Sequence, residues 1–218
     1  GPRMASAGQF EIWVQGKGGH GAEPHNCHDA VTCCAAIVNS LQTIVSREYR
    51  PIDAAVCTVG RMDVGTRWNV IADSGYLAGT TRCFDRQVFA EFPERIERIV
   101  KGTCEAYRCT YKTKYTTLTT PTVNHPYMAD IIDGACKKIY GDDDSYKIAF
   151  DPTTGGEDFC FFIDAAPDQM GAIALVGCGC EAKDTFHAHH SPKFKVDEDA
   201  LLNGACLYCQ VAADFLNK

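Results

Sequence analysis

The sequence predicts a mixed α/β protein in two parts, of which the first is the more regular. Over residues 9–118, strand-like and helix-like segments follow one another in the order strand, helix, strand, strand, helix, strand. The strand-like segments alternate apolar and polar residues or are rich in Thr and Tyr, whereas the helix-like segments repeat apolar residues every three or four positions. This order is typical of the split βαβ, ferredoxin-like fold, in which a four-stranded antiparallel sheet carries two helices on one face.

A glycine-rich turn joins the first strand to the first helix. Residues 9–15 alternate as a strand, and residues 16–25, GKGGHGAEPH, follow directly and present His20 among small residues. Taken alone, this stretch also fits a plain connecting turn. Beyond it we expect an amphipathic helix that begins at the N-cap Asp29 and ends near Ser46.

Two more strands, a second helix and a fourth strand complete the first part. The strands are expected over 54–62 and 75–84, with a polar loop between them. Asp85 is expected to cap the second helix, with Pro93 in its first turn. Residues 109–118 alternate again and form the last strand.

The pattern changes near residue 119, so we expect one domain over 8–118 and a second region over 119–218. The elements expected in the second region are a helix over 127–140, an acidic turn over 141–144, strands over 147–150 and 173–176, a short helix ending at Ile163, and a helix over 196–215. The last helix begins with the acidic residues 197–199, which favour its N-terminus. These elements are too few for a self-contained layered domain, so we expect the region to be part of a larger domain.

Composition excludes some classes of partner. The chain has 218 residues and a formal net charge of -7, without a run of five like charges. Nucleic acid and anionic membranes are therefore not expected as main partners, and no basic aromatic sheet face is visible in the sequence. The sequence also contains no apolar run of transmembrane length, so we expect a soluble protein without membrane association.

The chain contains thirteen cysteines, a high and odd number. A complete disulfide framework cannot pair an odd count, so reduced thiols in the cytoplasm are expected. Cys178 and Cys180, followed by His187, His189 and His190, suggest zinc, but a second C-x-x-C pair at zinc-finger spacing is missing. A structural zinc site made of cysteines is therefore not expected.

Several stretches, in matching order over nearly the whole chain, resemble one enzyme family. The chain resembles the two-zinc aminoacylase and exopeptidase family, which includes N-acyl-amino-acid amidohydrolases, auxin-conjugate hydrolases and hippurate hydrolases. The stretches are GPRMASAGQFEI, GKGGHGAEPH, LQTIVSRE, VGRMDVGTRWNVIAD, GTTRCFD, TTGGEDF and HHSPKFKVDEDAL.

The resemblance implies a domain arrangement. In this family an α/β catalytic domain that binds two metal ions is interrupted by a ferredoxin-like domain that forms a homodimer. The chain would then cover the dimerisation (lid) domain and the C-terminal portion of the catalytic domain. The ligand motifs of the family's first half do not occur in it. The isolated chain is therefore expected to be inactive.

The resemblance also implies roles for three residues in the family's reaction, in which a hydroxide held between two metal ions attacks an amide. His190 would be a metal ligand, with zinc as the metal and manganese or cobalt as alternatives. His20 would reach the partner's active site and donate to the oxyanion, with Asn69 near it. Close approach to the partner would explain the glycines around His20. A surface histidine and a turn-capping asparagine remain the alternative interpretations.

Substrate binding is expected at two further places. Arg82, at a strand end, could pair with the carboxylate of an N-acyl amino acid, although a structural salt bridge is an equal alternative. Thr154, Gly155 and Gly156 resemble the family's carboxylate-binding loop, where backbone N–H groups would bind. Glu157 and Asp158, next to this loop, are expected to cap the following helix rather than to act as an acid pair.

The sequence thus predicts a metal-dependent amidohydrolase or exopeptidase that cleaves N-acyl amino acids or similar carboxylate-bearing amides. The alternative is a non-catalytic dimerisation or binding protein that retains the inserted domain without the metal site. A ferredoxin-like nucleic-acid binder is disfavoured by the charge.

Overall fold

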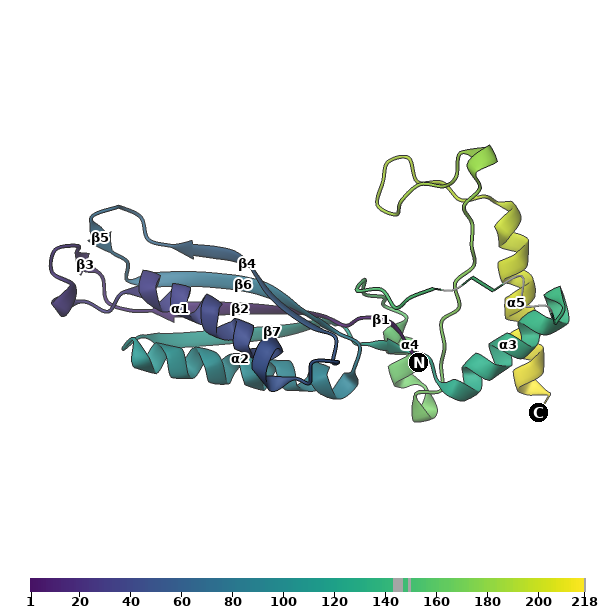
Figure 1. The fold of residues 1–218 in the computed structure, drawn as a ribbon, viewed down its shortest axis with the longest axis horizontal. Coiled ribbons are helices and arrows are strands. Elements are labelled where there is room, and N and C mark those ends of the chain that lie inside the picture. Colours follow the sequence, from purple (N-terminus) through teal and green to yellow (C-terminus); the bar gives the residue numbers. More distant parts are fainter. Residues whose placement is uncertain (143–146, 149, 218) are drawn as a thin grey trace. The chain divides into compact units, whose positions relative to one another are not determined.

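The computed structural model describes residues 1–142, 147–148 and 150–217. Contacts divide the chain into two compact units (Figure 1). The sheet unit comprises residues 2–123 and 152–162, and the helical unit comprises residues 1, 124–151 and 163–218. The two units are described separately below.

The sheet unit has the expected ferredoxin-like fold. Its four antiparallel strands lie in the order β4-β6-β2-β7, and two helices cover one face (Figure 1). The strands are β2 (Ala7–Gln15), β4 (Ala55–Val64), β6 (Ser74–Cys83) and β7 (Thr110–Thr119), and the helices are α1 (Ala30–Thr43) and α2 (Arg86–Ala106). The mixed α/β class and the strand order expected from the sequence are confirmed.

Alternation on the strands and periodicity on the helices create one core between the sheet and the helices. The inward residues of β2 are fully buried, and they pack with Leu77 of β6 against the apolar stripes of α1 and α2. The largest buried side chains are Phe10, Phe92, Ile12, Ile37, Leu41, Ile44 and Leu77. Burial of this apolar surface is the main stabilising contribution to the unit.

Both helices of the sheet unit begin at the expected caps. The carboxylate of Asp29 accepts a hydrogen bond from Val31 N, and that of Asp85 accepts from the N–H groups of Gln87 and Val88. The placement of Pro93 in the first turn is wrong, since it lies inside α2. A proline's missing N–H has no cost only in the first turn of a helix, where the N–H groups have no partner within the helix. Because α2 begins directly after Asp85, Pro93 lies beyond that turn.

Short elements extend the sheet unit at its two ends (Figure 1). At one end, β3 (Gly19–His20) pairs with β5 (Val70–Ile71). At the other end, β1 (Pro2–Met4) pairs with β8 (Thr122–Val123). The remaining short elements are a π-helical turn at Ile44–Glu48, the 3-10 turns Pro24–Asn26, Pro167–Gln169 and Glu181–Lys183, and α4 (Cys160–Ala165).

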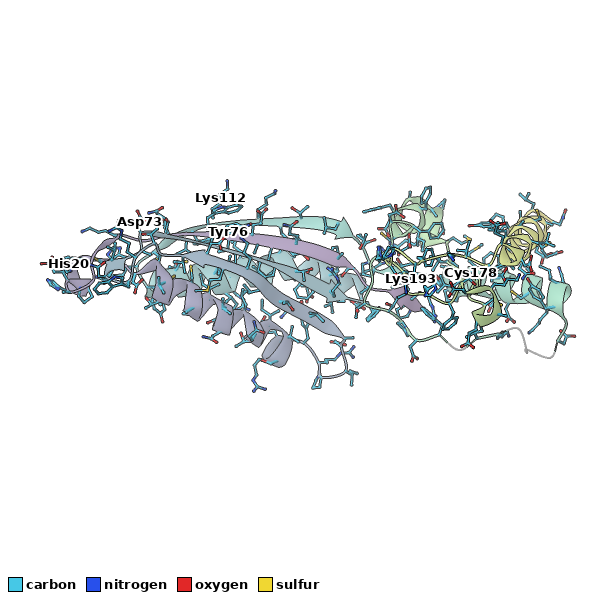
Figure 2. The ribbon with its side chains drawn as sticks, turned by 90° about the horizontal axis from the view of Figure 1, so that it is seen from above. His20, Asp73, Tyr76, Lys112, Cys178 and Lys193 are labelled. Atoms are coloured by element: carbon cyan, nitrogen blue, oxygen red, sulfur yellow. The ribbon has the colours of Figure 1, made fainter. Side chains whose placement is uncertain are left out.

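The face of the sheet opposite the helices carries aromatic and basic side chains (Figure 2). Trp13 packs against Tyr76 with ring centroids 5.5 Å apart, Lys112 Nζ lies 5.4 Å from the Trp13 centroid, and the Arg61 guanidinium carbon lies 5.3 Å from that of Tyr76. The expectation that the sheet has no basic aromatic face is therefore wrong. These residues are far apart in the sequence and come together only through the register of the strands. The chain's own cations cover both rings.

The helical unit contains α3 (Pro126–Tyr140) and α5 (Asp199–Leu216). Lys138 Nζ on α3 forms an ion pair with Asp214 Oδ1 on α5 at 2.5 Å. Asp197 and Glu198 precede α5 rather than forming its first turn, and Glu198 is its N-cap. No described residue of α5 is fully buried, and the side of the helix that contacts α3 is half-buried, with Gly204, Leu207, Val211 and Asp214 on it.

One expected strand of the helical unit is not found, and another lies partly outside the described residues. Residues 173–176 form no strand, and the side-chain amide of Asn124 takes both backbone groups of Ile173, since it donates to Ile173 O at 2.8 Å and accepts from Ile173 N at 2.9 Å. The strand over 147–150 and the turn over 141–144 lie partly outside the described residues, and residues 147, 148 and 150 are not in a strand. Within the described part of the chain, no helix is long and apolar enough to cross a membrane.

Candidate functional site

The ribbon formed by β3 and β5 brings together two of the residues singled out in the sequence. His20 lies opposite Val70 in the register, and Gly21 N donates to Asn69 O at 2.9 Å. Val70 N in turn donates to Arg67 O at 3.4 Å, which closes a turn with Trp68 and Asn69 at its centre. His20 and Asn69, 49 residues apart in the sequence, therefore lie side by side at one end of the sheet unit.

The His20 ring is held in one tautomer by the backbone. The N–H of Ala22 donates to Nδ1 of His20 at 3.0 Å. In a neutral imidazole one nitrogen accepts and the other carries the proton, so the proton is on Nε2. His20 is exposed, and Figure 2 places it at the far tip of the sheet unit. The ring therefore presents an Nε2–H donor to an incoming group.

The glycines of the 16–25 stretch serve close contacts within the ribbon. A Cβ on Gly21 would lie 2.8 Å from Asn69 O, and a Cβ on Gly18 would lie 2.8 Å from Ile71 O. Both approaches are closer than real Cβ atoms show. Contacts inside the domain therefore already account for Gly18 and Gly21.

The base of the ribbon is anchored to the rigid part of the sheet unit. Asp73 O accepts hydrogen bonds from Gly16 N at 2.7 Å and from the side-chain amide of Gln15 at 2.9 Å. Cys27 is buried beneath the loop, and its sulfur would lie 2.5 Å from a Cβ on Gly19. These contacts hold the two ends of the loop while its tip, with His20, stays exposed.

Gly21→Ala tests this arrangement. The added methyl group is expected to push β3 away from β5 and to cost about 1–3 kcal/mol locally, as overpacking does elsewhere. Amide hydrogen exchange at residue 21, whose N–H donates to Asn69 O, should accelerate. The matched control is Gly60→Ala, since a Cβ there meets nothing within 4 Å. Equal exchange at residue 21 in both variants would contradict the account.

Arg82 and the Thr154–Gly156 loop lie at the other end of the sheet unit. Arg82 Nη1 donates to Thr80 Oγ1 at 2.6 Å and to Thr81 O at 2.9 Å. Across residues 1–142, 147–148 and 150–217, no carboxylate lies within ion-pair distance of Arg82, so the structural salt bridge is not formed. The guanidinium therefore keeps donors for a carboxylate from outside the chain.

The glycine loop packs onto the sheet near the start of β2. Ala5 N donates to Gly155 O at 3.1 Å, and a Cβ on Gly156 would lie 2.7 Å from Thr119 Oγ1. The N–H of Gly155 already donates to Thr153 Oγ1 at 3.2 Å. Of the loop's backbone donors, that of Gly155 is thus occupied within the chain. The carboxylate of Glu157 accepts from Phe159 N at 3.4 Å, one residue before α4 begins.

The candidate residues therefore form two groups. Arg82 lies eight residues along β6 from Ser74, the residue that pairs with Gln15 just before the His20 loop. At about 3.3 Å per residue this separates Arg82 from the base of the ribbon by roughly 26 Å. An N-acyl amino acid spans two residue lengths, about 7 Å. The two groups of one chain cannot contact the same small substrate.

His190, the expected metal ligand, lies in an exposed turn of the helical unit with φ +60. Its neighbours have other contacts: His187 Nε2 lies 3.0 Å from Asp184 Oδ1, and His189 packs edge-on against Phe194. The hydrogen bond from His187 lowers the pKa of the Asp184 carboxyl. Among the described residues, no group of three or more His, Cys, Asp or Glu side chains could hold a metal ion. The described part thus supplies one imidazole and not a complete metal site.

Buried cysteines are not nucleophile candidates. Burial raises the pKa of Cys57 to about 11 and, together with the charges of its neighbours, that of Cys34 to about 11. At neutral pH both are thiols, which are weak nucleophiles. The described cysteines are free thiols, and eight of them are buried.

One conspicuous residue of the ribbon has no role in the sequence analysis. Trp68, beside Asn69, is 96% exposed. The sequence shows that Trp68 lies in the motif TRWNVIAD, next to Asn69, but only the fold shows that its side chain is almost fully exposed.

Comparison with known proteins relates the whole chain to one family. The model of peptidase family M20/M25/M40 matches residues 2–214. The chain is 38% identical over 202 residues to YhaA of Bacillus subtilis (strain 168), whose name describes an amidohydrolase, which covers 93% of this chain and 50% of that protein. It is 31% identical over 220 residues to the IAA-amino acid hydrolase ILR1-like 4 of Arabidopsis thaliana, which covers 99% of this chain and 49% of that protein.

Solved structures agree with these relatives. A structure described as an aminohydrolase from methicillin-resistant Staphylococcus aureus superposes with a TM-score of 0.87 at 28% identity, covering 99% of this chain and 54% of that one. The YXEP protein of Bacillus subtilis, described as a dinuclear metal binding peptidase, gives a TM-score of 0.73 at 24% identity, covering 100% and 52%. The chain spans about half the length of the curated relatives it matches.

Proposed function

Because the chain belongs to peptidase family M20/M25/M40, and is therefore a hydrolase of the peptidase and amidase type, we propose that the intact protein is a metal-dependent amidohydrolase. Its substrates are N-acyl amino acids or similar amides that carry a free carboxylate. The names of relatives support this class, since they include a hydrolase of IAA-amino acids and a deacetylase of N-acetyl-L-cysteine. We propose residues 8–118 as the dimerisation domain and residues 119–218 as the C-terminal portion of the catalytic domain.

Two divalent metal ions, zinc or else manganese or cobalt, would supply a hydroxide nucleophile at neutral pH. The description of the YXEP protein as dinuclear supports this number. Among the described residues we assign His190 as the ligand, since its imidazole is exposed, whereas its histidine neighbours His187 and His189 have other contacts. The other ligands lie outside the chain. The isolated chain is therefore inactive.

His20 stabilises the transition state. Its Nε2–H, oriented by the hydrogen bond to Nδ1, donates to the oxygen that becomes negative as the amide carbonyl is attacked. Asn69, held next to it by the ribbon, donates its side-chain amide to the same region. Neither residue needs to change protonation to do so.

Substrate carboxylate is bound at the opposite end of the sheet unit by Arg82 and by backbone donors of Thr154 and Gly156. The observation that carries this proposal is the roughly 26 Å between Arg82 and the base of the His20 ribbon. Both groups can act on one substrate only if they come from different chains. We therefore propose a homodimer through the sheet unit, in which His20 and Asn69 act in the partner's active site.

We propose the cytoplasm as the location, which the odd count of thirteen cysteines supports, since free thiols persist in a reducing compartment. No nucleic acid or membrane takes part in this function.

Hydrolysis assays on the full-length protein test the proposal. We expect release of the free amino acid from N-acyl amino acids, loss of activity after chelation, and recovery on addition of zinc, manganese or cobalt. A full-length protein that dimerises but neither binds metal nor hydrolyses any N-acyl amino acid would instead favour the non-catalytic binding protein.

A further inference from the structure

Trp68 is the most exposed large apolar side chain among the described residues, at 96%. The chain has only one other tryptophan, Trp13, which packs between Tyr76 and Lys112 on the sheet. An indole ring offers a large apolar surface, and leaving it in water forgoes the stabilisation that burial brings. A ring in this position is therefore expected to be covered when the protein acts.

The ring lies at the very tip that carries the proposed donors. Trp68 and Asn69 are the two central residues of the Arg67–Val70 turn, and Val70, 44% exposed, pairs with His20. The tip thus combines polar donors, His20 and Asn69, with an adjacent apolar surface, Trp68 and Val70. Since the turn is hydrogen-bonded to Gly21, the ring and the donors must move together.

The geometry of an N-acyl amino acid indicates which part of the substrate the ring meets. The carboxylate and the acyl chain lie on opposite sides of the amide that is cleaved. Arg82 of the subunit that holds the substrate takes the carboxylate side, while the ribbon of the other subunit approaches the carbonyl oxygen. The apolar surface next to His20 therefore faces the acyl side.

We propose that Trp68 is a specificity-determining residue that packs on the acyl group of the substrate in the partner subunit's active site. The preferred substrates are then N-acyl amino acids with an extended aliphatic or aromatic acyl group rather than an acetyl group. This inference rests on the proposed function, and specifically on His20 acting across the dimer.

The test is a chain-length series with full-length protein. N-acetyl, N-butanoyl and N-hexanoyl derivatives of one amino acid are compared by kcat/KM. In the wild type, kcat/KM is expected to rise roughly two- to fourfold per added methylene, as burial of a methylene group allows. Trp68→Ala should flatten this rise and lower kcat/KM for the hexanoyl substrate about tenfold or more, with little change for the acetyl substrate. Trp68→Phe should restore most of the rise, and the control Trp13→Phe should leave it unchanged.

A binding measurement supplies a readout apart from activity. The emission of Trp68 is obtained as the difference between the fluorescence of the full-length wild type and that of its Trp68→Phe variant. Titration with hexanoate should shift its emission to shorter wavelength, whereas acetate at the same concentration should not.

The outcomes separate the two proposals. The role of Trp68 would be overturned if Trp68→Ala lowered kcat/KM equally for all acyl chain lengths, or if it weakened the dimer without changing the chain-length series. The proposed function would still stand in that case, provided that His20→Ala abolishes turnover. Full activity of His20→Ala would instead overturn the proposed function on which the inference rests.

Discussion

Replacing His20 by alanine in the full-length protein is expected to lower kcat by about 100- to 1,000-fold, the usual cost of removing one oxyanion donor. The expected loss is in kcat because the Nε2–H contributes most when the carbonyl oxygen becomes negative. Metal content should stay unchanged, since His20 belongs to the ribbon and not to the segment of His190. Steady-state kinetics and elemental analysis on the same preparation measure both quantities.

The matched control for this variant is His25→Ala. His25 lies in the same exposed loop, on the 3-10 turn Pro24–Asn26, and has no proposed contact with substrate. It should keep kcat within about twofold of the wild type, as surface substitutions usually do. If His25→Ala loses as much activity as His20→Ala, the loop acts through its conformation and not through the His20 ring.

His190→Ala is expected to remove bound metal and, with it, activity by more than about 100-fold. Mutation of a residue that hydrogen-bonds to a metal ligand typically lowers metal affinity or activity about 10- to 100-fold, so loss of the ligand itself should lower them at least as much. Metal content per subunit, measured after dialysis, should fall from two equivalents towards one or none. The sheet unit should remain folded and dimeric, because His190 lies in the helical unit.

His189→Ala is the control for metal loss. His189 is next in sequence and is also exposed, but its ring packs on Phe194. We expect this variant to keep its metal. Depletion of metal to the same extent in both variants would show that the segment as a whole, and not His190, is responsible.

Much of the sheet unit could be predicted from the sequence, because its signals are local. Asp29 and Asp85 cap their helices through bonds to residues two or three positions away, and strand alternation is visible within nine or ten residues. Residues 173–176 show the limit of local signals. Their apolar run resembles a buried strand, but the backbone groups of Ile173 are taken by Asn124, 49 positions away.

The candidate site was predictable only in part, for the same reason. The resemblance singled out His20 and Asn69, but their proximity depends on the pairing of β3 with β5, which no local pattern encodes. The tautomer of His20 and the internal role of Gly18 and Gly21 likewise require the folded ribbon. The distance between Arg82 and that ribbon follows from the strand register, and it is this distance that favours a dimeric site.

Mixed dimers test the central claim most directly. Subunits carrying His20→Ala and subunits carrying His190→Ala are each nearly inactive alone. In a mixed dimer, the first keeps an intact metal site and the second keeps an intact His20, so one site per dimer becomes complete if His20 acts across the interface. Random mixing at equal amounts should recover about one quarter of the wild-type activity per subunit, since half of the dimers are mixed and each has one working site. If verified mixed dimers show no more activity than the two parents, His20 does not act in the partner's site and the account is wrong.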